Sequence, residues 1–181
     1  SGDSKFSSST SSPISQAVNQ RNVTATADAK TKVYGQSDPA LTYHITSGSL
    51  VGADTFTGAL SRLPGEAVAS YAIQRGTLAL TSNYNLTYVG ANLTITPLGI
   101  TVTADNLTTT YGDTLTFAGT EFTAVGLIGA DNVTSVTLTS DGTAVAATVA
   151  GSPYAIVPRA ALGTGLSNYP ISYVNGALTV N

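Results

Sequence analysis

The feature that most constrains this chain is an internal repeat with an offset of 77 residues. Val23-Thr-Ala-Thr-Ala-Asp28 aligns with Ile100-Thr-Val-Thr-Ala-Asp105, and the offset holds without a gap through Val51-Gly-Ala-Asp54 and Ile128-Gly-Ala-Asp131. The second copy then carries a small insertion near residues 144–152. A fixed period of this kind is the signature of an array, because each repeat is one folding unit. We therefore predict two tandem modules, residues 22–97 and residues 98–181.

Tyrosines and glycines recur between the two copies. A Tyr-Gly pair follows six residues after each aligned aspartate, and eight of the nine tyrosines have a counterpart in the other copy. The recurrent positions are Tyr34-Gly35 with Tyr111-Gly112, Tyr71 with Tyr154, Tyr84 with Tyr169 and Tyr88 with Tyr173. Each copy must solve the same packing problem without tryptophan, so we interpret these tyrosines as core or half-buried anchors whose hydroxyls bond backbone carbonyls.

Within each copy the apolar residues alternate with a period of two, which predicts strands. Leu86 and Tyr88 precede Gly90-Ala91, after which the alternation resumes, and the second copy repeats the pattern around Asn175-Gly176. Asn-Gly between alternating apolar residues is a strong hairpin signal, so we expect each module to end in a hairpin. The predicted fold class is all-β: two small antiparallel modules, with an immunoglobulin-like sandwich preferred and a β-grasp-like fold as the alternative.

The connection between the two copies is short. About four residues separate the last strand of the first copy from the first strand of the second, and one of them is Pro97, whose ring fixes φ. Two modules joined so closely cannot easily fold back side by side. We therefore predict an end-to-end arrangement with semi-rigid spacing.

Residues 1–21 are rich in serine and poor in apolar side chains. So little apolar surface cannot offset an ordering cost of about 1–2 kcal/mol per residue, and we expect a disordered leader or linker. The alternative is a strand over Ile14 to Val18 that is donated to an exposed sheet edge. Because methionine is absent, at position 1 as elsewhere, we expect an internal segment or a mature piece of a longer protein.

Composition limits the chemistry available to the chain. Cysteine is absent, which excludes disulfides and thiolate chemistry, and the single histidine, His44, has no counterpart in the second copy. After Pro97 the only cation is Arg159, although nucleic-acid binding needs several. No apolar run is long enough to span a bilayer. We expect no enzyme activity, no cofactor, no nucleic-acid partner and no membrane insertion in this segment.

Four aspartates recur beside alanine or glycine in turn-like contexts, Asp28 with Asp105 and Asp54 with Asp131. We interpret them as acceptors for nearby backbone amides. The alternative is a calcium site at a module junction. The sequence contains no Asp-x-Asp-x-Asp-Gly loop, so the number of ligands it implies is low.

The order of these signatures resembles the MBG domain of the YGX type, across residues 22–181. The residues that carry the resemblance are Thr-Ala-Asp28, Tyr34-Gly35, Gly-Ala-Asp54, Tyr71-Ala-Ile, Asn83-Tyr84 and Gly-Ala-Asn-Leu-Thr-Ile-Thr-Pro97. The second copy departs from the pattern where Asp38-Pro39 has no counterpart. The resemblance implies an exported repeat, found in long tandem arrays of bacterial filamentous-haemagglutinin-like and other large surface adhesins. It brings no catalytic residues.

Together these observations predict a structural stalk of an extracellular bacterial adhesin that projects a binding region away from the cell surface. The expected partners are neighbouring repeats of the same adhesin and, through sheet edges, identical chains on other cells. The alternative function is a glycan- or mucin-binding module that recognises host or other surface glycans. In that case Tyr43, Tyr88 and Tyr173 are the candidates for stacking on sugar rings.

Overall fold

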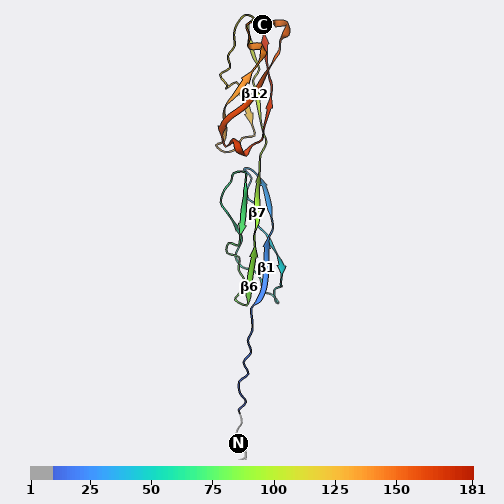
Figure 1. The fold of residues 1–181 in the computed structure, drawn as a ribbon, viewed down its shortest axis with the longest axis vertical. Helices are drawn as coiled ribbons and strands as arrows, with labels where there is room; N and C mark the ends of the chain where they lie inside the picture. Colours follow the sequence, from blue (N-terminus) through green and yellow to red (C-terminus); the bar gives the residue numbers. More distant parts are fainter. Residues whose placement is uncertain (1–9) are drawn as a thin grey trace, which may run out of the picture.

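The computed structural model describes residues 10–181, which form two β modules in line along one axis (Figure 1). Module 1 contains strands β1 to β7 and module 2 contains strands β8 to β14, with residues 97–99 between them. Among the described residues the only helices are three short 3-10 turns, all in module 2. The prediction of two tandem all-β modules is confirmed.

The elements have the following bounds. In module 1 they are β1 (Arg21–Ala27), β2 (Lys30–Val33), β3 (Tyr43–Ser47), β4 (Ser61–Arg62), β5 (Ser70–Gln74), β6 (Tyr84–Val89) and β7 (Ala91–Thr96). In module 2 the strands are β8 (Ile100–Ala104), β9 (Leu107–Thr109), β10 (Phe122–Val125), β11 (Asn132–Thr139), β12 (Tyr154–Thr164), β13 (Ile171–Val174) and β14 (Gly176–Val180). The 3-10 turns are η1 (Asp141–Thr143), η2 (Val149–Gly151) and η3 (Leu166–Asn168).

Each module is built from a three-stranded and a four-stranded sheet. The strand orders are β3-β1-β6 and β2-β7-β5-β4 in module 1, and β10-β8-β13 and β11-β12-β14-β9 in module 2. The alternation of the sequence decides which side chains face inward, because successive residues of a strand point to opposite faces. Val23, Ala25 and Ala27 on β1 are all buried, and so are their counterparts on β8.

The two sheets of each module enclose one apolar core. In module 2 the buried cluster joins Val102 on β8 with Ile156 on β12 and Leu178 on β14, so strands of both sheets contribute. Module 1 has the equivalent cluster, formed by residues of β1, β5 and β7. Two sheets around one core are the layer arrangement of the preferred sandwich.

The first and last strands of each module run parallel. β1 pairs with β6 from Arg21↔Tyr84 onward, and after each strand changes sheet, β2 pairs with β7 in the same register from Lys30↔Leu93 onward. Module 2 repeats the arrangement with β8 and β13 and with β9 and β14. The expectation of wholly antiparallel modules was wrong on this point. Because these strands share one direction, the chain enters a module at one end and leaves it at the other.

The predicted terminal hairpins are also wrong. β6 and β7 belong to different sheets, and so do β13 and β14. Neither Gly90 nor Gly176 has the positive φ that the Asn-Gly hairpin turn requires. Gly176 lies instead where the chain passes from β13 to β14, beside the connection from β8 to β9, and a Cβ built on it would stand 2.4 Å from the carbonyl oxygen of Asp105. The glycine is needed for this close backbone approach and not for a turn.

The predicted leader is described only in part, because residues 1–9 lie outside the described range. Residues 10–20 form no helix or strand and are exposed, and β1 begins at Arg21. Ile14 and Val18 are 96% and 89% exposed. The structure therefore does not pair the segment from Ile14 to Val18 with a sheet edge.

A cluster of four charged side chains binds together the loops at the end of module 1 that faces module 2 (Figure 1). Lys32 on β2 has a side chain only 3% exposed, and its Nζ lies 2.6 Å from Asp38 and also donates to Glu66. Arg62 on β4 donates to the same two carboxylates and to the backbone oxygen of Gly65. The second copy has Thr at the position of Lys32 and Leu at that of Asp38. In module 2 Leu115 instead packs against the apolar core.

The cluster lowers the pKa of its acids. The hydrogen bonds from Arg62 and then Lys32 lower the pKa of Asp38 to about 2, against an ordinary value of 3.8. The hydrogen bond from Lys32, followed by that from Arg62, lowers the pKa of Glu66. A depressed folded-state pKa contributes stability that is complete above about pH 4 and is lost as the pH falls toward about 2.

We predict that Asp38→Asn destabilises module 1 and removes much of its acid sensitivity. Breaking a fully buried pair costs about 3–5 kcal/mol, and because Asp38 is 38% exposed we expect on the order of 1–2 kcal/mol here. Urea unfolding followed residue by residue by NMR at pH 7 and pH 3 measures the two modules separately. Asp113→Asn, which removes an exposed carboxylate of module 2, is the control and is expected to leave the urea midpoints of both modules unchanged. An unchanged urea midpoint for module 1 in Asp38→Asn would contradict this account.

Candidate functional site

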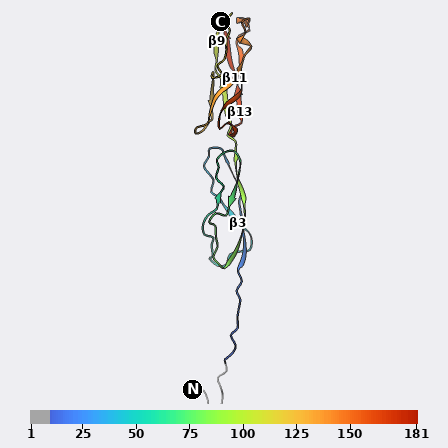
Figure 2. The same cartoon turned by 60° about the vertical axis from the view of Figure 1, so that its left-hand side comes forward.

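Residues of both modules converge where the chain passes from β7 to β8, and Figure 2 shows the two modules meeting end to end at this place. Module 1 contributes the Tyr34-Gly35 loop that follows β2. Module 2 contributes the loop that precedes β11 and the residues at the end of η3. Three signature residues of the repeat, Tyr34, Asp131 and Tyr169, meet there. We call this group of contacts the joint.

One oxygen of the Asp131 carboxylate accepts two tyrosine hydroxyls. Tyr34 Oη of module 1 donates to Asp131 Oδ2 over 2.9 Å, and Tyr169 Oη of module 2 donates to the same atom over 2.6 Å. The Tyr169 oxygen also accepts the backbone N–H of Ile128 at 3.2 Å. The two rings meet edge to face, with centroids 5.4 Å apart and planes at 88°. Edge-to-face pairs are favourable, and hydrogen bonds to an ionised acceptor are stronger than neutral ones.

Gly35 and Ile128 form the apolar side of the joint. Gly35 has φ of +83°, and a Cβ built on it would stand 2.0 Å from Ile128 Cδ1. The position therefore needs glycine for its left-handed backbone and also for the close approach of the isoleucine side chain. Ile128 is half-buried as a result.

Hydrogen bonds to Asn168 fasten the chain on both sides of the connection. Asn168 is 7% exposed, and its backbone oxygen accepts the N–H of Leu98 at 3.2 Å. Its side-chain oxygen accepts the N–H of Val68 at 2.9 Å. Leu98 lies in the connection, and Val68 follows the loop that the Lys32 cluster holds. Module 2 is thus bonded both to the connection and to the body of module 1.

The joint changes the acidity of its tyrosines. Burial, followed by the hydrogen bond to Asp131, raises the pKa of Tyr169 to about 12. The bond to Asp131 is also the main cause that raises the pKa of Tyr34 above its ordinary value of 10. Both hydroxyls therefore stay protonated and keep donating at neutral pH. Because these folded-state pKa values are raised, the contribution of the bonds is complete below about pH 10 and is lost as the pH rises through about 12.

The polar groups of the joint bind one another. Within residues 10–181, no buried side-chain nitrogen or oxygen lacks a hydrogen-bond partner. The Asp131 carboxylate, the two hydroxyls and the Asn168 amide each find their partner across or beside the junction. These hydrogen bonds hold the two modules together in one orientation.

Comparison with known protein families matches residues 23–94 and residues 100–179 to the MBG domain, YGX type. The chain belongs to the MBG family. The resemblance seen in the sequence is confirmed for both copies, and MBG domains are repeat modules of the adhesin type. The two matches coincide with module 1 and module 2, so the joint is a contact between consecutive MBG domains. No curated protein and no solved structure matches the chain.

The recurrent tyrosines outside the joint lie within their own MBG modules. The hydroxyls of Tyr71, Tyr88 and Tyr154 donate to backbone carbonyls over distances between 2.8 and 3.1 Å. The Tyr173 oxygen accepts the backbone N–H of Ala161 at 2.8 Å. These side chains tie strands and loops of one module together and do not reach the junction.

The sugar-stacking candidates lie on three strands of two modules. Tyr43 is on β3 and packs edge to face with Phe56, with ring centroids 5.0 Å apart. Tyr88 is on β6, and Tyr173 is on β13 of the other module. The structure therefore does not bring the three tyrosines together into one aromatic platform.

The recurrent aspartates divide into two pairs. Asp54 and Asp131 each accept a tyrosine hydroxyl at 2.6 Å. Asp28 bonds to Thr42 and His44, and the Thr42 bond is the main cause of its lowered pKa. Asp105 accepts the Thr123 hydroxyl at 3.4 Å. In the part of the chain that the structure describes, no group of three or more His, Asp or Glu side chains is placed to hold a metal ion.

The sequence pattern does not predict the contact between Tyr34, Asp131 and Tyr169. It indicates anchors within one module for the tyrosines and a turn role for the aspartate. The available signal was their position in each copy: Tyr-Gly follows the second strand, while the Gly-Ala-Asp turn and the Asn-Tyr pair lie near strands that start at the other end. The parallel course of the first and last strands, which the alternating pattern does not predict, brings the two sets face to face.

We predict that Asp131→Asn lowers the pKa of Tyr169 below about 12 and lowers that of Tyr34, because the substitution removes the negative charge beside both hydroxyls. Part of the Tyr169 shift remains, since burial is its first cause. Titration of ¹³Cζ-labelled tyrosine by NMR measures each hydroxyl separately.

Module 1 supplies the matched control for this titration. The hydrogen bond to Asp54 is the main cause of the raised pKa of Tyr84, so Tyr84 is expected to respond to Asp54→Asn and not to Asp131→Asn. If Tyr34 kept its titration midpoint in Asp131→Asn, the hydrogen bond across the junction would not exist in solution.

Proposed function

We propose that this chain is a spacer segment of an extracellular bacterial adhesin, in which MBG modules in line carry a binding region away from the cell surface. The observation on which the proposal rests is the joint. Residues 97–99 are too few to act as a flexible linker, and Tyr34, Asp131 and Asn168 bond the modules on both sides of them. Because such a connection keeps the modules in line, each module adds its full length to the distance that the chain spans.

The course of the strands supports the same proposal. The chain enters each module at one end and leaves it at the other, and the two modules lie along one axis (Figure 1). Adding a module in the same way extends the axis without changing its direction. Repeat arrays of this sort are quasi-one-dimensional, because each unit contacts only its neighbours.

The proposed location is the bacterial cell surface, and the proposed role is mechanical rather than enzymatic. The MBG family is associated with surface adhesins. Among residues 10–181, no helix has the length and apolar character needed to cross a membrane. A surface with few charges relies on threonine and serine for its polarity, which suits a module whose task is to be displayed and not to bind polyanions.

We predict an elongated particle in small-angle X-ray scattering. A compact chain of 181 residues would have a radius of gyration of about 16 Å, and the spacer proposal requires a clearly larger value. A variant that lacks residues 1–19 is the control, because it removes the contribution of the leader. A radius of gyration close to that of a compact chain in this variant would refute the spacer proposal.

Self-association of identical chains is the second part of the proposal. β3 and β10 are edge strands with one unpaired side, and Val125 on β10 is 65% exposed. Both strands are short, which is one way that natural proteins limit edge pairing. The association that these edges support is therefore weak, as suits contacts repeated many times between arrays on neighbouring cells.

We predict reversible association at high concentration in sedimentation velocity, with monomers at low concentration. Val125→Lys places a charge on the edge of β10 and should reduce the association, whereas Val145→Lys, at an exposed valine in the loop between η1 and η2, is the control away from any sheet edge. A strictly monomeric profile at high concentration would refute the self-association part and leave the spacer part unaffected.

A further inference from the structure

The joint between the two modules has two halves, and each half occurs a second time at a free end of the molecule. We propose that these ends are docking surfaces for further MBG repeats in series. The end of module 1 that carries Asp54 and Tyr84 receives the Tyr-Gly loop of a preceding repeat. The end of module 2 that carries Tyr111 and Gly112 docks onto the Asp and Asn-Tyr residues of a following repeat. This inference rests on the proposed spacer function and extends it to both ends.

The acceptor half is already assembled at the free end of module 1. Tyr84 Oη donates to Asp54 Oδ2 over 2.6 Å and accepts the N–H of Val51 at 2.8 Å. The same two bonds, at 2.6 and 3.2 Å, link Tyr169 to Asp131 and to Ile128 in the occupied joint. The free surface therefore has the geometry of the occupied one before a partner arrives.

Equivalent residues are exposed at the free end and covered at the occupied joint. Val51 is 55% exposed, whereas its counterpart Ile128 is half-buried against Gly35. Asn83 is exposed, whereas its counterpart Asn168 is 7% exposed. These are the differences expected between an open and a filled copy of one binding surface.

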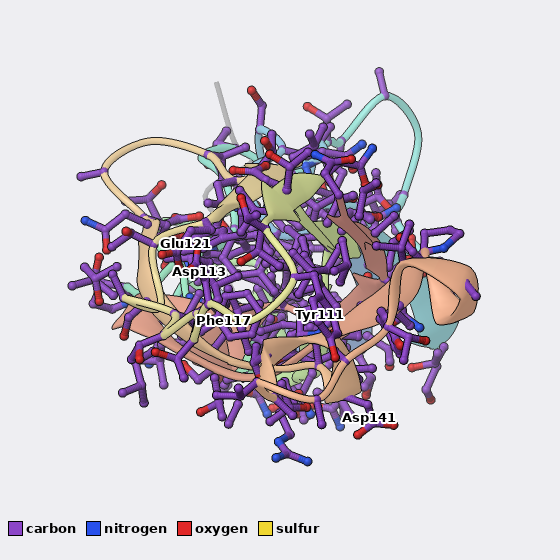
Figure 3. The ribbon with its side chains drawn as sticks, turned by 90° about the horizontal axis from the view of Figure 1, so that it is seen from above. Tyr111, Asp113, Phe117, Glu121 and Asp141 are labelled. Atoms are coloured by element: carbon purple, nitrogen blue, oxygen red, sulfur yellow. The ribbon has the colours of Figure 1, made fainter. Side chains whose placement is uncertain are left out.

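The donor half is exposed at the free end of module 2. Tyr111 is 60% exposed, and Figure 3, which looks onto this end, shows it on the loop that follows β9. Gly112 has φ of +93°, close to the +83° of Gly35, but a Cβ built on it would meet nothing within 4 Å. The loop thus has the backbone form of the Tyr34-Gly35 loop without the neighbouring isoleucine.

Backbone hydrogen bonds hold the chain at both free ends as they do at the occupied joint. The N–H of Arg21 donates to the oxygen of Asn83 at 2.9 Å, as that of Leu98 does to Asn168 at 3.2 Å. At the other end the N–H of Tyr111 donates to Asn181 at 2.9 Å, as that of Tyr34 does to Thr96 at 2.9 Å. The backbone at each free end is therefore held by the same hydrogen bond as its counterpart at the occupied joint.

A second copy of this chain, joined in series, is the occupant that fits both ends. Its Gln20-Arg21-Asn22 aligns with Pro97-Leu98-Gly99, so joining residue 20 directly to Asn181 reproduces the length of the natural connection. One contact is not reproduced. Val68, which donates to Asn168, lies three residues before Tyr71, and the residue three before Tyr154 is Gly151 in η2, whose N–H already bonds to Thr148. The new joint is expected to have one hydrogen bond fewer.

The experiment uses the full chain followed by residues 20–181 of a second copy, which gives four modules. Because the chain has no cysteine, spin labels can be placed at Thr87→Cys and Ser172→Cys, which are exposed and equivalent positions of the two modules. Labels in modules 1 and 2 report on the known joint by double electron–electron resonance. Labels in modules 2 and 3 report on the new one.

We expect the two distance distributions to have the same mean and similar narrow widths. Tyr111→Ala in the first copy should broaden only the distribution across modules 2 and 3, and Tyr34→Ala in the first copy should broaden only that across modules 1 and 2. A broad distribution at the new joint beside a narrow one at the known joint would overturn this inference alone. Broad distributions at both joints would overturn the spacer function itself.

Discussion

The structure of this chain depends on one carboxylate oxygen that two modules share. Asp131 accepts the hydroxyl of Tyr169 from its own module and that of Tyr34 from the module before it. The first bond keeps the acceptor in place, and the second makes it a contact between modules. Since the carboxylate and both hydroxyls are engaged at neutral pH, the contact is polar and directional. Directional contacts fix an orientation, whereas apolar burial alone is non-directional.

The parallel first and last strands make this contact useful. If the last strand of an MBG module returned antiparallel to the first, the chain would leave where it entered and two modules would lie side by side. In this fold β1 pairs in parallel with β6, and β2 pairs in parallel with β7 in the same register. Acceptor and donor residues therefore lie at opposite ends of every module, and their spacing becomes the spacing of the array. Gly176, whose backbone lies close to the carbonyl oxygen of Asp105, permits this course in the second module.

The repeat, the all-β class and the short connection could all be predicted from the sequence, because offset, period and chain length are local properties. The course of the last strand could not. Asn175-Gly176 has the residues of a hairpin turn, and only the close approach to the backbone of Asp105 in the folded module shows why glycine is there. The role of Lys32 was equally hidden, because its partners Asp38 and Glu66 come together only when the loops fold. The joint combines residues 97 positions apart in the chain, beyond the reach of pattern reading.

The central claim is that two MBG modules tumble as one body, and residual dipolar couplings in a weakly aligning medium test it most directly. At 18.3 kDa the chain is small enough for couplings to be measured in both modules at once. The account predicts that the two modules report a single alignment tensor of equal magnitude and direction. Two tensors of clearly different magnitude would show that the modules move independently, and would contradict the account.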